Sequence, residues 1–128
     1  VTMLGEMLKS LNPDNVACGN IGLPVCDVVE SRKTENLSLS IEIAGFQLLG
    51  CETFKPAVSV IMNLTPDHID YFGSEDAYYR SKTLIYKNQD ENDWFIKNID
   101  DENIMKYCND VNCRVITFSL YDSEADLR

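Results

Sequence analysis

Polar side chains follow three predicted strands, at the points where those strands end. Asn20 comes after the first strand, Glu42 closes the second, and Asp67-His68 follow the third. Because ligands gather at the carboxyl ends of parallel strands in open α/β sheets, we expect these segments to meet at one sheet edge. A carboxylate at such an edge could bind a divalent metal.

Each of these residues also has a plainer interpretation. The sequence Gly19-Asn20-Ile21-Gly22 is typical of an ordinary tight turn. Glu42 is either a solvated charge at a strand end or a metal ligand, and its position leaves both open. His68 is the only histidine; single histidines are usually surface residues, but a loop after a buried strand favours function. Lys82, taken alone, is a lysine on a helix surface.

Short apolar runs alternate with helical patterns, which predicts an α/β fold with a mostly parallel sheet flanked by helices. The predicted strands cover residues 15–18, 37–43, 57–63, 94–97 and 113–118. The predicted helices cover residues 1–11, 24–30, 74–86 and 101–107. The first helix has an apolar face formed by Leu4, Met7, Leu8 and Leu11. Ser74 is a suitable N-cap for the third helix. We expect residues 64–71 to form a loop and residues 121–128 an uninformative polar tail.

The chain has 128 residues, enough for one modest core, and a formal net charge of -10. So acidic a surface repels nucleic acid and anionic lipid, and we exclude both as partners. A domain of this charge that handles nucleotides needs positive charge from elsewhere, and divalent metal on its own carboxylates would supply it. On charge alone, a solvated acidic face is the simpler explanation. No apolar run is long enough to span a bilayer, so we expect a cytoplasmic protein.

The cysteines do not form a pattern that would indicate disulfide bonds or a metal site. They are odd in number and include no C-x-x-C pair, which argues against both disulfides and a structural zinc site. We expect reduced, mostly buried thiols. The cysteines are Cys18, Cys26, Cys51, Cys108 and Cys113.

The longest motif in the chain surrounds His68 and Lys82. Residues 63–70 read NLTPDHID, followed by FGS at 72–74, AY at 77–78 and SKTLIYKNQ at 81–89. This order resembles the Mur ligase signature N-L-T-P-D-H-L-D-x-x-G-S-x-x-A-Y-x-x-A-K-x-x-I-F-x-N-Q. GNIGLP at 19–24 and NIDD at 98–101 also resemble segments of that family. The resemblance implies a central domain with a P-loop NTPase-like fold, and residues 1–128 would form part of that domain.

Residues 41–48, IEIAGFQL, resemble one branch of the family more than the others. The pattern E-L-S-S-F-Q-L belongs to the MurD branch, which adds D-glutamate, whereas the MurE branch has S-S-H after its glutamate. The Phe46-Gln47 pair argues against MurE and against folylpolyglutamate synthases. Ala44 and Gly45 depart from the pattern, because they replace two serines that help to line the substrate and metal site. A non-catalytic Mur-ligase-like binding domain is therefore an alternative.

The resemblance implies a chemistry as well as a fold. The full-length protein would use ATP to phosphorylate the carboxylate of UDP-N-acetylmuramoyl-L-alanine, and D-glutamate would then attack the acyl phosphate. This reaction is a step of peptidoglycan precursor synthesis. Another Mur ligase or a folylpolyglutamate synthase-type ligase is the alternative enzyme.

The same resemblance assigns roles to residues of this chain. Glu42 would bind Mg²⁺ near the ATP phosphates, and His68 would help to hold a second Mg²⁺ and the reacting carboxyl group. Lys82 would carry a carbamate, formed with CO₂, that supports the second ion. The substrate would contact Asn20, Ala44, Gly45 and His68. Asp67 and Asp70 would orient His68 or metal-bound water from behind.

Three parts of such a ligase are expected to lie outside residues 1–128. In the MurD branch, the helix VTMLGEML directly follows a phosphate-binding loop, G-x-x-G-K-T-T, which cradles the ATP phosphates. A uridine-nucleotide-binding domain precedes that loop, and a C-terminal domain binds D-glutamate. We therefore expect the chain alone to be inactive and the full-length protein to be a monomer.

Overall fold

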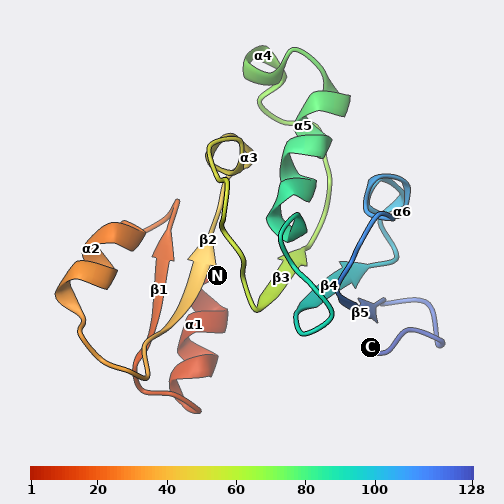
Figure 1. Cartoon of the computed structure of the whole chain (residues 1–128). Coiled ribbons are helices and arrows are strands. Elements are labelled where there is room, and N and C mark those ends of the chain that lie inside the picture. Colours follow the sequence, from red (N-terminus) through yellow and green to blue (C-terminus); the bar gives the residue numbers. More distant parts are fainter. The chain divides into compact units, whose positions relative to one another are not determined.

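The computed structural model describes all 128 residues, which divide into two compact units, Val1–Ala44 and Gly45–Arg128. Each unit contains a parallel sheet with helices against it (Figure 1), so the predicted α/β class is confirmed. The units are described in turn. No helix has both the length and the apolar character needed to cross a membrane.

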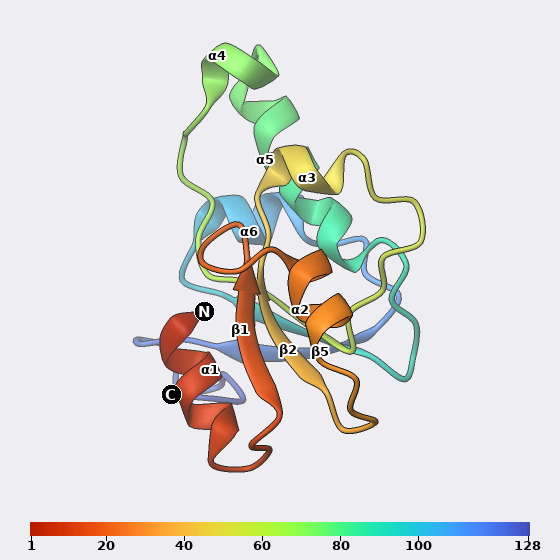
Figure 2. The same cartoon turned by 90° about the vertical axis from the view of Figure 1, so that its left-hand side faces the viewer.

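Unit 1 has a two-stranded parallel sheet with one helix on each face. β1 (Asn15–Gly19) pairs with β2 (Ser38–Glu42), and α1 (Thr2–Lys9) and α2 (Val25–Ser31) lie on opposite sides of them (Figures 1 and 2). The α2 side is apolar. Its buried residues are Val16, Cys18 and Val28, with Leu39 and Ile41 packed against them.

The face toward α1 is made of small and polar side chains. Asn15 donates from Nδ2 to Ser38 Oγ at 2.9 Å and accepts from Ser40 Oγ at 3.1 Å. Gly5 is the buried residue of α1, and a side chain there would collide with Ala17. A glycine in the helix therefore allows α1 to approach β1 closely.

The predicted apolar face of α1 does not make this contact. Met7 and Leu11 are 63% and 82% exposed, and Leu4 is exposed as well. The 3.6-residue period correctly predicts the helix, but the approach to the sheet depends on Gly5, which the apolar period does not include.

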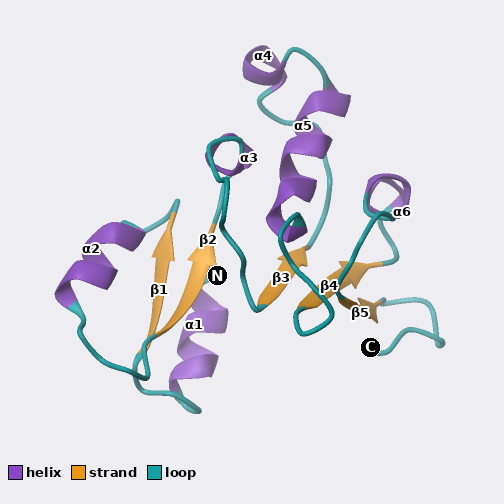
Figure 3. Ribbon diagram, in the orientation of Figure 1, coloured by secondary structure: helices purple, strands orange, loops and turns teal.

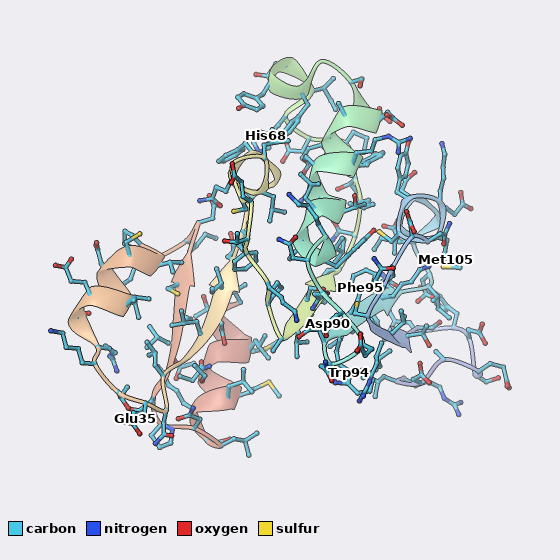
Figure 4. The ribbon with its side chains drawn as sticks, in the orientation of Figure 1. Glu35, His68, Asp90, Trp94, Phe95 and Met105 are labelled. Atoms are coloured by element: carbon cyan, nitrogen blue, oxygen red, sulfur yellow. The ribbon has the colours of Figure 1, made fainter.

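Unit 2 is a three-stranded parallel sheet in the order β3-β4-β5. The strands are β3 (Val58–Ile61), β4 (Trp94–Asn98) and β5 (Arg114–Phe118). Figure 3 shows the helices α5 (Glu75–Thr83) and α6 (Glu102–Tyr107) beside this sheet. Side chains of both helices share one core with the sheet. Phe95 lies at its centre (Figure 4). The buried residues of the core are Ile61, Leu64, Tyr78, Tyr79, Tyr86, Phe95, Ile104 and Cys108.

Short helices account for the errors of the prediction in unit 2. α3 (Gly45–Leu48) was not predicted. α4 (Ile69–Phe72) begins inside the loop predicted for residues 64–71, so the last residues of that predicted loop are helical. The helix expected to reach residue 86 ends at Thr83, and a 3₁₀ turn, η1 (Leu84–Tyr86), follows it. A helix of one turn shows no repeating apolar period, so the sequence pattern does not reveal it.

The side chains of residues 87–90 hold the connector between α3 and β3. Asn88 donates from Nδ2 to the carbonyl oxygens of Glu52 and Phe54, both at 2.9 Å. Gln89 is buried, accepts from Ser59 Oγ at 2.7 Å and donates to the Pro56 carbonyl at 2.8 Å. The Asn-Gln end of the long motif is therefore a structural clamp in this unit.

The C-terminal residues are ordered against β5, contrary to the expected uninformative tail. Asp126 Oδ2 accepts from the backbone N–H and from Oγ1 of Thr117, each at 2.8 Å. Leu127 forms a parallel bridge to Phe118. These contacts continue the sheet beyond its last strand.

All five cysteines are free thiols, as predicted. The expectation that most are buried is wrong, because only Cys18 and Cys108 are. Cys26 is exposed, and Cys51 and Cys113 are partly exposed. The two buried thiols lie in apolar cores, and burial raises the pKa of each.

Candidate functional site

Asn20 and Glu42 lie together at the carboxyl end of the unit 1 sheet. β1 and β2 run parallel in register, which brings Gly19 level with Glu42. The Asn20 backbone N–H donates to the Glu42 carbonyl at 2.8 Å, and Asn20 Nδ2 lies 3.4 Å from Glu42 Oε1. Two residues 22 positions apart in sequence therefore present an amide and a carboxylate at one edge.

Gly19 makes this arrangement possible. Its φ is +113°, in the region that side chains disfavour, and a Cβ there would overlap the Glu42 carbonyl oxygen. The turn closes with the Gly19 N–H donating to the Leu23 carbonyl at 2.9 Å. The glycine thus turns β1 away at its end without displacing Glu42.

In unit 2, His68 occupies a strained position directly before α4. It is the only non-glycine residue with positive φ, at φ 50° and ψ 31°. Its backbone N–H donates to Asp67 Oδ1 at 2.8 Å, and its Nε2 lies 3.5 Å from Asp67 Oδ2. Left-handed backbone in a non-glycine residue is uncommon and is found more often at functional positions. Asp67 holds both the backbone and the ring of His68.

His68 and Lys82 both contact the ring of Tyr78. The His68 and Tyr78 ring centroids are 6.2 Å apart in an edge arrangement, and Lys82 Nζ lies 5.0 Å from the Tyr78 centroid. Phe46 of α3 also packs edge-on against His68, with centroids 6.2 Å apart. Figure 4 labels His68 on the segment that leads into α4. Unit 2 therefore brings together two of the predicted site residues around a buried tyrosine.

The loop after β3 is held by the last residue of β4 and by residues at the start of α6. Asp101 accepts from the Leu64 backbone N–H at 3.0 Å and caps α6 by accepting from the Ile104 N–H at 2.9 Å. Asn103 donates to the Leu64 carbonyl at 2.9 Å, and Asn98 donates to the Met62 carbonyl at 2.9 Å. No role in the site was predicted for these residues from the sequence. The NIDD segment was the available signal for two of them.

The remaining predicted residues are distributed as follows. Ala44 ends unit 1, and Gly45 opens α3 and is buried. Asp70 is an exposed residue in the first turn of α4, next but one to His68. Because Glu42 lies in unit 1 and His68 and Lys82 lie in unit 2, the convergence of all three stays a prediction.

The chemistry of these side chains can be compared with what Mg²⁺ requires. The ion binds oxygen, keeps several waters, and is usually held by one or two carboxylates together with substrate phosphates. Glu42 offers such a carboxylate, and its only hydrogen bond to a side chain within unit 1 is the long contact with Asn20. No group of three or more His, Cys, Asp and Glu side chains lies close enough to form a closed cage. A single carboxylate such as that of Glu42 therefore suits Mg²⁺, which takes its other ligands from water and substrate phosphates.

Lys82 fits a metal only after modification. An ammonium group has no lone pair to donate, whereas a carbamate on Nζ would present oxygens. The Lys82 side chain is partly exposed, and the His68 side chain is 53% exposed, so both are accessible to small molecules.

Residues 20–128 match the family described as the Mur ligase middle domain. That match covers the whole of unit 2 and, in unit 1, α2 and β2, and it includes Asn20, Glu42, His68 and Lys82. The chain belongs to the Mur ligase middle-domain family. The resemblance of its motifs to Mur ligases is thereby confirmed.

The most similar relatives include enzymes named UDP-N-acetylmuramoylalanine–D-glutamate ligase. The Geobacillus kaustophilus protein is 37% identical over 118 residues, which are 92% of this chain and 26% of the relative. The Bacillus cereus (strain G9842) protein is 39% identical over 114 residues, or 89% of this chain and 25% of the relative. The chain spans about a quarter of the length of the curated relatives it matches.

A solved structure shows the same fold. The structure of UDP-N-acetylmuramoyl-L-alanyl-D-glutamate–2,6-diaminopimelate ligase aligns with 98% of this chain and 30% of its own, with a TM-score of 0.67. The sequence identity is 18%, so this similarity concerns the fold alone.

Proposed function

We propose that the chain is the central part of an ATP-dependent ligase that joins D-glutamate to UDP-N-acetylmuramoyl-L-alanine. The observation that carries the proposal is the 37% identity to a D-glutamate ligase across 92% of the chain. It is supported by the Phe46-Gln47 pair and by Glu42, His68 and Lys82, which are all present. The proposed reaction would be a step of peptidoglycan precursor synthesis in the cytoplasm.

The reaction needs an activated acid, because an amine does not displace hydroxide from a carboxylic acid. An oxygen of the substrate carboxylate attacks the γ-phosphorus of ATP, ADP leaves, and an acyl phosphate forms. The D-glutamate amine then attacks the acyl carbon, loses a proton, and inorganic phosphate departs as the amide forms. Magnesium, when bound, would neutralise the charge that opposes phosphoryl transfer between anions.

The predicted site residues would have different roles in this reaction, according to their positions. Glu42 would hold the metal beside the nucleotide phosphates, and Asn20 would donate a hydrogen bond to substrate at the same edge. His68 would bind the second ion and the reacting carboxyl group, with Asp67 fixing its ring. Ala44 and Gly45 would form the substrate wall through backbone and small side chains.

Lys82 would act as a carbamate. Its neutral amine adds to CO₂, forming an N–C bond and releasing a proton, and the product carries a negative charge. That charge would support the second Mg²⁺. The phosphate-binding loop and the nucleotide-sugar and D-glutamate domains would be supplied by other parts of the full-length protein, and the chain by itself is expected to be inactive.

The test is phosphate release by the complete protein that contains this chain. With ATP, Mg²⁺ and UDP-N-acetylmuramoyl-L-alanine, release should require D-glutamate and should not be supported by diaminopimelate. Lys82→Ala should lower the rate by a factor of about 10² or more, and short carboxylic acids should restore part of it.

Lys106→Ala is the matched control, because Lys106 Nζ also lies 5.0 Å from a tyrosine ring, that of Tyr107. It should leave the rate unchanged. A Lys82→Ala protein as fast as the wild type would refute the carbamate role. Absence of any D-glutamate-dependent release in the wild type would favour the non-catalytic binding domain.

A further inference from the structure

Gly45 and Ser81 meet where α3 packs on α5, inside unit 2. A Cβ on Gly45 would overlap Ser81 Oγ, while Ser81 Cβ and Phe72 Cζ would lie at 3.4 and 3.5 Å from it. Removal of one oxygen atom would therefore turn the overlap into ordinary contact. The room for a side chain at position 45 depends on the hydroxyl of Ser81.

That hydroxyl is not free to turn away. Ser81 is 2% exposed, and its Oγ donates to the Tyr78 carbonyl at 2.7 Å. Rotation about χ1 would break this bond inside a packed core, where a lost hydrogen bond leaves a polar group unsatisfied. Ser81 therefore keeps its oxygen against Gly45.

Both residues depart from the motif patterns at the same contact. The patterns carry serine at position 45 and alanine at position 81, whereas this chain has Gly45 and Ser81. Relative to the patterns, position 45 has lost a hydroxymethyl group and position 81 has gained a hydroxyl oxygen, and that oxygen occupies part of the space left open at Gly45.

We propose that Gly45 and Ser81 are a complementary pair that sets the spacing of α3 and α5 and thereby positions Lys82 and Phe46. Lys82 directly follows Ser81 in α5, and Phe46 directly follows Gly45 in α3. Ser81 is thus a positioning residue, and its role in turnover rests on the ligase function proposed above. The loss of serine at position 45 is compensated within the fold.

The first test is a double-mutant cycle in the full chain. Gly45→Ala should lower Tm by about 5–15 °C through overpacking. Ser81→Ala should lower it by only ~2–5 °C, for the lost hydrogen bond. The Gly45→Ala/Ser81→Ala variant should melt within about 2 °C of the wild type or above it, because alanine favours the helix. If the decrease in Tm of the double variant equals the sum of the decreases in the two single variants, Gly45 and Ser81 are not a complementary pair.

His68 supplies a second readout. It is the only histidine, and its ring lies at the edge of Phe46, so its proton NMR signals report where α3 holds that ring. The signals should shift in Gly45→Ala and return in the double variant. An unshifted signal in a folded Gly45→Ala chain would contradict the positioning role.

The third test uses turnover by the complete protein at a temperature where every variant is folded. Gly45→Ala should lower kcat about tenfold or more, and addition of Ser81→Ala should raise kcat at least about threefold above that of Gly45→Ala. Recovered stability without recovered kcat would overturn the positioning role. If the wild type has no ligase activity, the proposed function fails, while the Tm and NMR measurements still decide the pair.

Discussion

The two units hold their site residues by different means. In unit 1, Asn20 and Glu42 are placed by strand register, a backbone hydrogen bond and the positive φ of Gly19. In unit 2, His68 and Lys82 are placed by contacts of side chains around Tyr78. Backbone geometry tolerates changes of side chain, whereas an aromatic cluster does not. Unit 1 should therefore be most sensitive to substitution of Gly19, and unit 2 to substitution of the aromatic residues around Tyr78.

The largest expected effect is that of Gly19→Ala. The new Cβ would overlap the Glu42 carbonyl oxygen and lie 3.0 Å from the Glu42 backbone nitrogen, so the paired strands would have to separate. Overpacking together with backbone strain should destabilise unit 1 by about 3 kcal/mol or more, enough to unfold so small a core. Loss of amide protection in residues 15–19 and 38–42 under hydrogen exchange would measure this.

Gly22→Ala is the control for that substitution. Gly22 also has positive φ, at 82°, but a Cβ there would meet nothing within 4 Å. Only the backbone strain remains, about 1 kcal/mol. Equal destabilisation by the two substitutions would show that strand contact is not what Gly19 protects.

Tyr78→Ala should be the most damaging single change to the site in unit 2. Tyr78 is 5% exposed, and truncation of a buried aromatic residue costs about 3 kcal/mol. Lys82 and His68 would lose their shared contact, so the His68 NMR signals should move, while the amides of β1 and β2 keep their protection. Tyr78→Phe keeps the ring and should leave those signals in place. Loss of protection in unit 1 would contradict the division between the units.

Asp126 provides a smaller effect that depends on pH. The backbone N–H and hydroxyl of Thr117 lower the pKa of Asp126 below its ordinary 3.8. A lowered pKa in the folded state contributes stability above the ordinary value, and that contribution is lost as pH falls through the folded value. Asp126→Asn should therefore reduce Tm at pH ~6, and the reduction should become smaller as pH falls below 3.8. A difference in Tm that persists unchanged to the lowest pH would refute the charged contact.

Asn20→Ala should have the smallest effect on stability. The amide lies 3.4 Å from Glu42 and is exposed, while the backbone bond between the two residues remains. Tm should change by less than about 2 °C. If Asn20 binds substrate as proposed, the complete ligase should lose roughly tenfold in kcat/KM. A large fall in Tm would show that the side chain, and not the strand register, fixes this edge.

The sequence was informative where structure follows from a repeating pattern. The five strands lie at short segments that carry apolar residues, and parallel register alone places Asn20 next to Glu42. α3 and α4 escaped prediction because four residues show no period. The contacts of Phe46 with His68 and of Gly45 with Ser81 depend on how two elements dock, which spacing along the chain does not encode. Family motifs identified the residues of this region, but not their contacts.

The pairing of Leu127 with β5 has a consequence for solution behaviour. β5 is the last strand of its sheet, and the N–H of Ser119 and the carbonyl of Thr117 bond to Leu127. Without that segment, the strand would present unpaired backbone groups to any extended peptide nearby. Deletion of residues 122–128 should therefore increase self-association of the protein through intermolecular β-strand pairing at β5.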